Sequence, residues 1–138
     1  MKLSICILNW NTSKVVQRTL DMLEYELKDF LAEVIVIDNG SNEENRMILR
    51  KYQNNHFSYR VHYNKENKGI SIGKNQGIDM ACGEYILLLD GDVLPVRNSI
   101  TLMAKFLDDN LDKHTIGMYP NKWTNKKNSE GCKWAIRS

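Results

Sequence analysis

Asp90 and Asp92 are the residues of this 138-residue sequence whose type and spacing most clearly suggest chemistry. They follow the apolar run Tyr85 to Leu89, and Gly91 between them would leave room for a substrate to come close. If the backbone stays extended, both carboxylates point to the same side and can share one ion. Mg²⁺ and Mn²⁺ prefer carboxylate and phosphate oxygens. The pair therefore predicts a Mg²⁺ or Mn²⁺ site completed by a diphosphate; the alternative is a pair of ordinary acidic turn residues.

A third carboxylate, Asp38, ends the apolar run Glu33 to Ile37 and precedes Asn39 and Gly40. A carboxylate in this place can accept a hydrogen bond from the imide or amino group of a nucleobase. Trp10, after the first apolar run, could offer a flat apolar surface beside the base. Asp before Asn-Gly-Ser is equally typical of a turn or a helix cap, and a Trp at a strand end often only packs. Both interpretations stay open at this point.

Two lysines, Lys68 and Lys74, flank a glycine-rich segment and could face a pyrophosphate, although exposed lysines are usually only solvated. The glycines match neither the dinucleotide fingerprint nor the phosphate loop, which argues against hydride transfer and P-loop chemistry. The histidines, His56, His62 and His114, show no metal-ligand spacing and no triad partner, so we interpret them as structural.

Apolar patterns of period two and period 3.6 alternate along the chain, which indicates strands separated by helices. Strands are expected at residues 3–8, 33–37, 59–63, 85–89 and 115–119, and helices at 12–30, 41–54, 69–81 and 98–110. The predicted fold is therefore an α/β sandwich around a mainly parallel sheet. In such sheets ligands bind beyond the carboxyl ends of the strands, so residues 9–11, 38–40 and 90–92 should meet at one rim.

Local signals refine the expected helices. Ser41 and Glu44 stand at the spacing of a capping box, which predicts the start of the second helix. Gly69, Gly73 and Gly77 recur every four residues, so they should share one face that lets the helix approach the sheet closely. The side chains expected to be buried by the second and fourth helices are Met47, Ile48, Tyr52, Ile100, Met103, Phe106 and Leu107.

The composition, with 42% hydrophobic and 26% charged residues, is typical of one folded globular domain. The net charge of +2 requires no acidic partner, and nucleic-acid binding is not expected. Residues 121–138 carry five basic side chains against one glutamate, which predicts a basic polar tail. Three widely spaced cysteines, Cys6, Cys82 and Cys132, support neither a disulfide framework nor a zinc site, and a reducing cytoplasm is the simplest location. No apolar run is long enough to cross a bilayer.

Four segments, in their order and spacing, resemble family 2 glycosyltransferases of the GT-A type, and the first resembles the rhamnosyltransferase-like members. They are residues 4–12 (SICILNWNT), residues 34–41 (VIVIDNGS), residues 64–77 with the pattern N-x-G … N-x-G, and residues 83–92 (GEYILLLDGD). The resemblance implies a GT-A nucleotide-sugar-binding domain over residues 1–120. Residues 121–138 would then be the basic tail or the start of an acceptor region, so the fold is expected to be truncated at its acceptor side.

The resemblance also implies roles for individual residues. Asp38 would bind the base, Asp90 would lie near the ribose or the metal, and Asp92 would coordinate the metal on the diphosphate. Lys74 occupies a place where the family often has a basic residue. The expected nucleotide-sugar-binding set is Leu8, Asn9, Trp10, Asn11, Asp38, Asn39, Gly40, Lys68, Gly69, Lys74, Asn75, Asp90, Gly91 and Asp92, with Asp90 and Asp92 as the metal ligands.

The implied activity is transfer of a sugar from a UDP- or dTDP-sugar with Mn²⁺ or Mg²⁺ to an acceptor hydroxyl, with inversion. The acceptor, whether a saccharide, a lipid-linked molecule or another compound, is not specified. Inversion requires a general base, which the family carries in its acceptor half, beyond the metal motif. Glu130 is the only carboxylate after Asp112, and nothing around it resembles the family's catalytic segment, so the base stays unassigned.

Two other functions compete with this one. The first is a non-catalytic nucleotide-sugar-binding subunit that works in a complex, and donor hydrolysis would separate it from the enzyme. The second is a sugar nucleotidyltransferase, which would need a glycine-rich, basic loop after the first strand, where this chain has residues 9–12 (NWNT). If the acceptor half is missing, apolar surface near Trp123 and Trp134 should seek a partner chain or a second copy.

Overall fold

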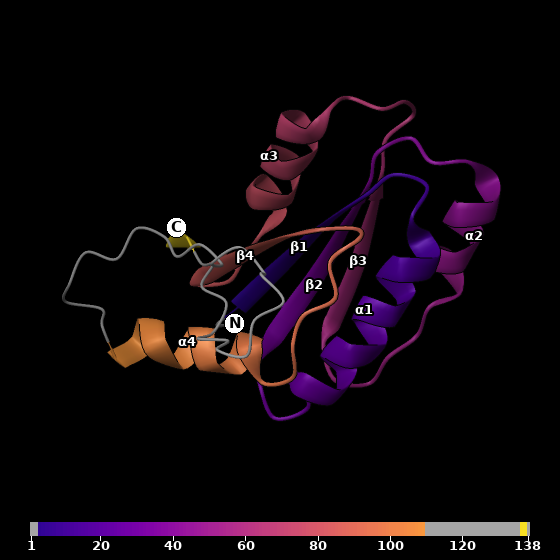
Figure 1. Cartoon of the computed structure of the whole chain (residues 1–138). Coiled ribbons are helices and arrows are strands. Elements are labelled where there is room, and N and C mark those ends of the chain that lie inside the picture. The colour runs from indigo at the N-terminus through magenta and orange to yellow at the C-terminus, as the bar shows by residue number, and fades with distance from the viewer. Residues whose placement is uncertain (1–2, 110–135, 138) are drawn as a thin grey trace, which may run out of the picture.

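The computed structural model describes residues 3–109 and 136–137, and these residues confirm the alternation of strands and helices (Figure 1). The elements are β1 (Leu3–Asn9), α1 (Ser13–Glu26), β2 (Ala32–Asp38), α2 (Glu43–Lys51), β3 (Ser58–Tyr63), α3 (Ile70–Met80), β4 (Tyr85–Asp90), α4 (Ser99–Asp109) and β5 (Ile136–Arg137). The strand expected at residues 115–119 lies outside the described residues. None of the described helices has the length and apolar content that crossing a membrane requires.

The sheet has the order β3-β2-β1-β4-β5, in which the first four strands are parallel. β5 pairs antiparallel with β4, at a place where the sequence predicts only a polar tail. β2 is buried along its whole length, as a strand covered on both faces must be. The predicted mainly parallel sheet is therefore confirmed, with one antiparallel strand at its edge.

Successive side chains of the central strands pack against different helices. Ile5 and Ile7 belong to the larger apolar core, which α1, α2 and α4 complete on one face. Cys6 belongs to a smaller core on the other face, which α3 covers (Figure 1). Because side chains alternate along a strand, this division produces three layers, with helices on both sides of the sheet.

The close approach of α3 to the sheet depends on two of the predicted glycines. A Cβ atom on Gly77 would lie 2.9 Å from the Cβ of Cys6, and one on Gly73 would lie 2.5 Å from a methyl group of Leu8. Gly69 differs, because a Cβ there would meet nothing within 4 Å. Gly69 is the N-cap of α3 with a φ of 84°, so it serves the backbone conformation.

The predicted start of α2 is wrong by one residue. Asn42, not Ser41, is the N-cap, and its side chain accepts a hydrogen bond from the Asn45 amide (3.0 Å). The hydroxyl of Ser41 is buried and accepts hydrogen bonds from the side chain of Asn9 and the amide of Asn11. Contacts with β1 and the loop that follows it therefore replace the expected capping box.

Burial also differs from expectation on α2 and α4. On α2 Met47 is 39% exposed, and the buried side chain is Leu49, which with Tyr52 at i+3 forms the inner face. Phe106 is 44% exposed because the inner face of α4 runs through Ile100, Met103, Ala104 and Leu107 at i, i+3, i+4 and i+7. Burial of Tyr52, Ile100, Met103 and Leu107 is confirmed. α1 ends at Glu26, four residues before its predicted end.

A buried carboxylate, Glu33, joins the parallel strands near their amino ends. It accepts hydrogen bonds from the Ser4 hydroxyl (2.6 Å) and the Cys82 amide (2.7 Å), and it pairs with Arg60 (2.5 Å). The Gly83 amide donates to the same Ser4 hydroxyl (2.7 Å). Burial by itself raises the pKa of Glu33, but the hydrogen bonds more than offset this, and the pKa lies below its ordinary value. The ionised carboxylate therefore stabilises the fold.

We predict that Glu33→Gln lowers the free energy of unfolding by about 2 to 4 kcal/mol at pH 7, because the amide cannot replace a charged acceptor of three bonds. The depressed pKa means that the wild-type protein has this contribution above pH 4.5 and loses it as the pH falls through the folded pKa. Urea unfolding between pH 7 and pH 3 would measure both effects. The variant should therefore lose less stability than the wild type over this range.

Glu43→Gln is the matched control, because Glu43 also pairs with an arginine, Arg50, but at the protein surface. Its effect should stay below about 1 kcal/mol. Equal losses in the two variants, or an unchanged pH profile in Glu33→Gln, would contradict the role assigned to Glu33.

Candidate functional site

The carboxyl ends of β1, β2 and β4 form one rim, as the sequence predicts. In the register of the sheet Asn9 is opposite Asp38, and Leu8 is opposite Asp90. The last residues of these strands and the loops that follow them carry most of the predicted site residues. The rim is therefore the candidate site.

Asp38 is fully buried, and both oxygens of its carboxylate accept hydrogen bonds from other groups of the protein. One oxygen accepts a hydrogen bond from the Asn9 side chain (2.9 Å). The other accepts from the Arg46 guanidinium (3.0 Å) and the Ser41 amide (3.3 Å). Because no part of Asp38 reaches the surface, a direct contact with a nucleobase would require the groups that cover it to move. What the structure shows is a carboxylate that holds the rim together.

Asn39 holds the loop that leads into α3. Its amide nitrogen donates to the side chain of Asn67 (2.9 Å) and the carbonyl of Gly69 (3.2 Å). Its oxygen accepts from the side chain of Asn64 and the amide of Lys68, both at 3.0 Å. Both polar atoms of its side chain are thus used within the protein, and they fix the start of α3 beside β2.

Trp10 lies on a loop that neighbouring residues hold in place. Asn11 has a φ of 56°, its amide donates to the Ser41 hydroxyl (2.9 Å), and its side chain accepts from the Asn42 amide (2.9 Å). The side chain of Trp10 is 55% exposed. Because the loop is tied on both sides, the indole is presented to solvent at a defined place instead of completing a core.

Two glycines of the rim are required by close contacts within the protein. Gly40 has a φ of 79°, and a Cβ there would lie 2.4 Å from the carbonyl carbon of Glu66. Gly91 is buried, and a Cβ there would lie 2.7 Å from both the Leu8 carbonyl oxygen and the Thr12 hydroxyl. The predicted reason for Gly91, room for a substrate, is therefore replaced by packing against the β1–α1 loop.

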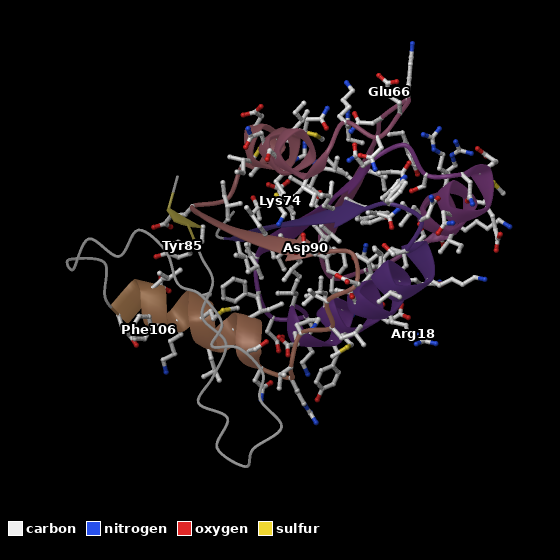
Figure 2. The ribbon with its side chains drawn as sticks, turned by 45° about the horizontal axis from the view of Figure 1, so that its top comes forward. Arg18, Glu66, Lys74, Tyr85, Asp90 and Phe106 are labelled. Atoms are coloured by element: carbon white, nitrogen blue, oxygen red, sulfur yellow. The ribbon has the colours of Figure 1, made fainter. Side chains whose placement is uncertain are left out.

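The acidic pair lies at the exposed end of β4. The strand ends at Asp90, and the Val93 amide donates to the Asp90 carbonyl (3.1 Å), so the backbone turns there. The assumption of an extended backbone through Asp92 is wrong, and Asp92 is exposed on the turn. Lys74 of α3 extends to Asp90, with 2.9 Å between its ammonium and one carboxylate oxygen (Figure 2). One carboxylate of the pair therefore has a protein counter-ion.

The acidic pair fits a hard divalent cation only if a ligand supplies further oxygens. Among the residues that the structure describes, no three His, Cys, Asp or Glu side chains are grouped to hold a metal ion. Asp90 and Asp92 offer exposed carboxylate oxygens, the donors that Mg²⁺ and Mn²⁺ prefer. Phosphate oxygens would complete such a shell.

The remaining predicted residues have different surroundings. Lys68 and Asn75 are exposed, and the backbone amide of Lys68 donates to the Asn39 side chain. Leu8 is half-buried in the smaller core under α3, so it supports the site from below. Asn9 is buried and bonded to Asp38.

Arg46 is the important rim residue that the sequence interpretation missed. It pairs with Asp38, donates to the carbonyl of Asn64 (2.5 Å), and lies over the ring of Tyr63 at 5.8 Å. The only signal in the sequence is indirect. A buried aspartate needs a partner, and Arg46 is in the first turns of the helix that follows Asp38.

The comparisons with known proteins agree with this geometry. The family model described as glycosyl transferase family 2 matches residues 4–132. An uncharacterized glycosyltransferase of Escherichia coli, YibD, is 32% identical over 113 residues, which cover 80% of this chain and 32% of that protein. A cholesterol galactosyltransferase of Borreliella burgdorferi is 32% identical over 92 residues, 66% of this chain and 25% of that protein.

Solved structures share the fold. The crystal structure of residues 1–349 of Staphylococcus aureus TarS superposes with a TM-score of 0.71 at 25% identity, covering 94% of this chain and 38% of that one. A Pyrobaculum calidifontis mannosyltransferase in complex with GDP-Man and Mn²⁺ reaches a TM-score of 0.78 at 19% identity, covering 99% and 44%. The expected GT-A fold is thereby confirmed.

The chain spans about a third or less of the length of both curated relatives. Within that span, the family match extends through the described strands and helices, from β1 to α4. The chain belongs to glycosyl transferase family 2.

Proposed function

We propose that this chain binds a nucleoside diphosphate sugar, a UDP- or dTDP-sugar, together with Mn²⁺ or Mg²⁺, as the donor side of a glycosyltransferase. The observation that carries the proposal is the rim itself, where exposed Asp90 and Asp92 stand with Lys74 at the strand ends that also present Trp10. These are the groups that a cation, a diphosphate and a base would each need. Residues 1–120 would form this donor-binding domain.

Each exposed rim residue has a role in the proposal. The indole of Trp10 stacks against the base, and the ammonium groups of Lys68 and Lys74 face the phosphates. Asp90 and Asp92 hold the cation. The buried residues, with Asp38 foremost, keep the loops in place. A direct contact of Asp38 with the base would additionally require the groups that cover this buried carboxylate to move when the nucleotide binds.

In the proposed reaction the acceptor hydroxyl attacks the anomeric carbon while the bond to the diphosphate breaks, with inversion. Asp90 and Asp92 would hold the divalent cation, which would supply positive charge to stabilise the leaving diphosphate. Lys74 adds a positive charge at the same place without itself transferring a proton. Inversion also requires a general base, and Glu130, the one carboxylate after Asp112, lies outside the described residues.

The solved relatives support a nucleotide sugar as the ligand. TarS has been crystallised with UDP-GlcNAc and with UDP, and the P. calidifontis enzyme with GDP-Man and Mn²⁺. Because this chain spans only part of those proteins, sugar transfer to an acceptor stays a proposal. A non-catalytic nucleotide-sugar-binding subunit that works in a complex is the second candidate, and an assay of donor hydrolysis would separate it from the enzyme.

We place this function in the cytoplasm. Of the cysteines that the structure describes, Cys6 and Cys82 are free thiols, as a reducing compartment would keep them. Burial raises the pKa of Cys6 to about 12, so its thiol stays protonated and unreactive.

The first prediction of the proposal concerns the metal. UDP should bind the wild-type chain at least about tenfold more tightly with Mn²⁺ than with a chelator, and Asp92→Asn should remove most of that difference. Calorimetric titration with UDP, dTDP and GDP would measure this effect and identify the preferred base. Asp79→Asn is the control, because Asp79 is exposed at the other end of α3. Equal affinity of the wild type with and without metal would show that the acidic pair has no metal role.

The second prediction concerns the base. Trp10→Ala should weaken UDP binding about fivefold to a hundredfold, because stacking of a base on an aromatic ring contributes about 1 to 3 kcal/mol. Trp10→Phe should keep most of the affinity. Inorganic pyrophosphate, which has no base, should bind all three proteins equally. If pyrophosphate binding fell in parallel with UDP binding, the substitution would have damaged the loop and the stacking role would be unsupported.

A further inference from the structure

Lys74 contacts Asp90, a candidate metal ligand, although the proposed site also needs the ammonium of Lys74 for the diphosphate. The ammonium lies 2.9 Å from one Asp90 oxygen, so one of the two candidate metal ligands already has a cation beside it. Lys74 is also the lysine that the structure places at the carboxyl end of β4, beside the carboxylates where the proposed site puts the diphosphate. The same side chain thus faces both the metal ligands and the expected diphosphate.

We propose that Lys74 acts as an exchangeable counter-ion, which keeps Asp90 from a divalent cation until the phosphates of a nucleoside diphosphate draw the ammonium away. The inference rests on the proposed function and adds to it an order of events, in which nucleotide binding comes before full coordination of the cation. A cation alone finds Asp90 occupied, and the nucleotide makes the carboxylate available. In this scheme the ammonium of Lys74 pairs with Asp90 in the free chain and with the phosphates when the nucleotide is bound.

The exposure of the pair makes such an exchange feasible. The side chains of Lys74 and Asp90 are 30% and 55% exposed, so water screens their attraction. An exposed pair of this kind is weak enough for a diphosphate, which carries more negative charge than one carboxylate, to compete for the ammonium. The lysine side chain is long and flexible, so it can move between the two acceptors while α3 stays in place.

The fixed position of α3 argues that the side chain moves and the helix does not. Gly73 and Gly77 bring the helix within van der Waals contact of Leu8 and Cys6, and a shift of the backbone would open that interface. Asn39 also holds the start of the helix through the Gly69 carbonyl. Exchange therefore needs only a change in the side chain of Lys74.

The charges of the site predict how the removal of Lys74 would change the binding of Mn²⁺. With Lys74 in place, the group of Lys74, Asp90 and Asp92 carries one net negative charge; without the lysine it carries two. Lys74→Met should therefore strengthen the binding of Mn²⁺ alone by about three- to tenfold, while the binding of UDP alone becomes weaker. In Lys74→Met the factor by which UDP strengthens Mn²⁺ binding should be smaller than in the wild type. Thermodynamic linkage requires that Mn²⁺ strengthens UDP binding by the same factor.

Two variants separate this exchange from a general effect of charge. Lys68→Met removes an equal charge from the rim, and within residues 3–109 Lys68 forms no ion pair, so Asp90 keeps its partner. Its affinity for Mn²⁺ alone should stay within about twofold of the wild type. Lys74→Arg keeps a positive charge in reach of Asp90 and should restore the wild-type behaviour.

The experiment uses the 138-residue chain and its three variants. Free aqueous Mn²⁺ is measured by its electron paramagnetic resonance signal in titrations with Mn²⁺ alone and with Mn²⁺ in saturating UDP. Tighter binding of Mn²⁺ alone in Lys74→Met, but not in Lys68→Met, supports the exchange. The same Mn²⁺ affinity in Lys74→Met and the wild type, or an equal gain in both methionine variants, overturns it.

The two proposals fail in different ways. If UDP has no effect on Mn²⁺ binding in the wild type, the nucleotide-sugar site itself is wrong. If UDP strengthens Mn²⁺ binding by the same factor in the wild type and in Lys74→Met, the site stands and the counter-ion role of Lys74 is wrong.

Discussion

The candidate site depends on one buried carboxylate. Asp38 stands at the end of the most buried strand, where a negative charge without partners would cost several kcal/mol. Three groups from different parts of the chain satisfy it: the Asn9 side chain at the end of β1, the Ser41 amide before α2, and the Arg46 guanidinium on α2. Satisfying this charge therefore ties the loop after β1 and the loop before α2 to the end of β2.

The polar groups of the rim consequently fall into two classes. Asp38 and Asn39 are buried, and their polar atoms are bonded to the protein, so they build the site. Trp10, Asp90 and Asp92 are exposed and are the groups left for a ligand. This division explains how the loops can be fixed where they leave the sheet while exposed side chains beside them stay available to a ligand.

The strands, their mainly parallel direction and the meeting of their carboxyl ends could be predicted from the sequence, because they follow from the period of the apolar residues and the geometry of parallel sheets. What could not be predicted depends on partners distant in the sequence. The hydroxyl of Ser41 is used by Asn9, so it does not cap α2, and Gly91 is required by contact with the residues after β1. The roles of Ser41 and Gly91 follow from contacts in the fold, and the sequence around each residue does not indicate these roles.

β2 itself shows why a carboxylate at a strand end is weak evidence of function. Glu33 and Asp38 are both buried, both pair with an arginine, and both join neighbouring strands, yet they lie at opposite ends of the sheet. The burial and pairing of Asp38 alone therefore do not distinguish a ligand-binding carboxylate from a purely structural one such as Glu33. Asp90 differs from both, because it is exposed and pairs with a flexible lysine, Lys74, that a phosphate can recruit. The capacity to exchange that partner, more than the presence of acidic residues, is what distinguishes this end of the sheet as a place for ligand chemistry.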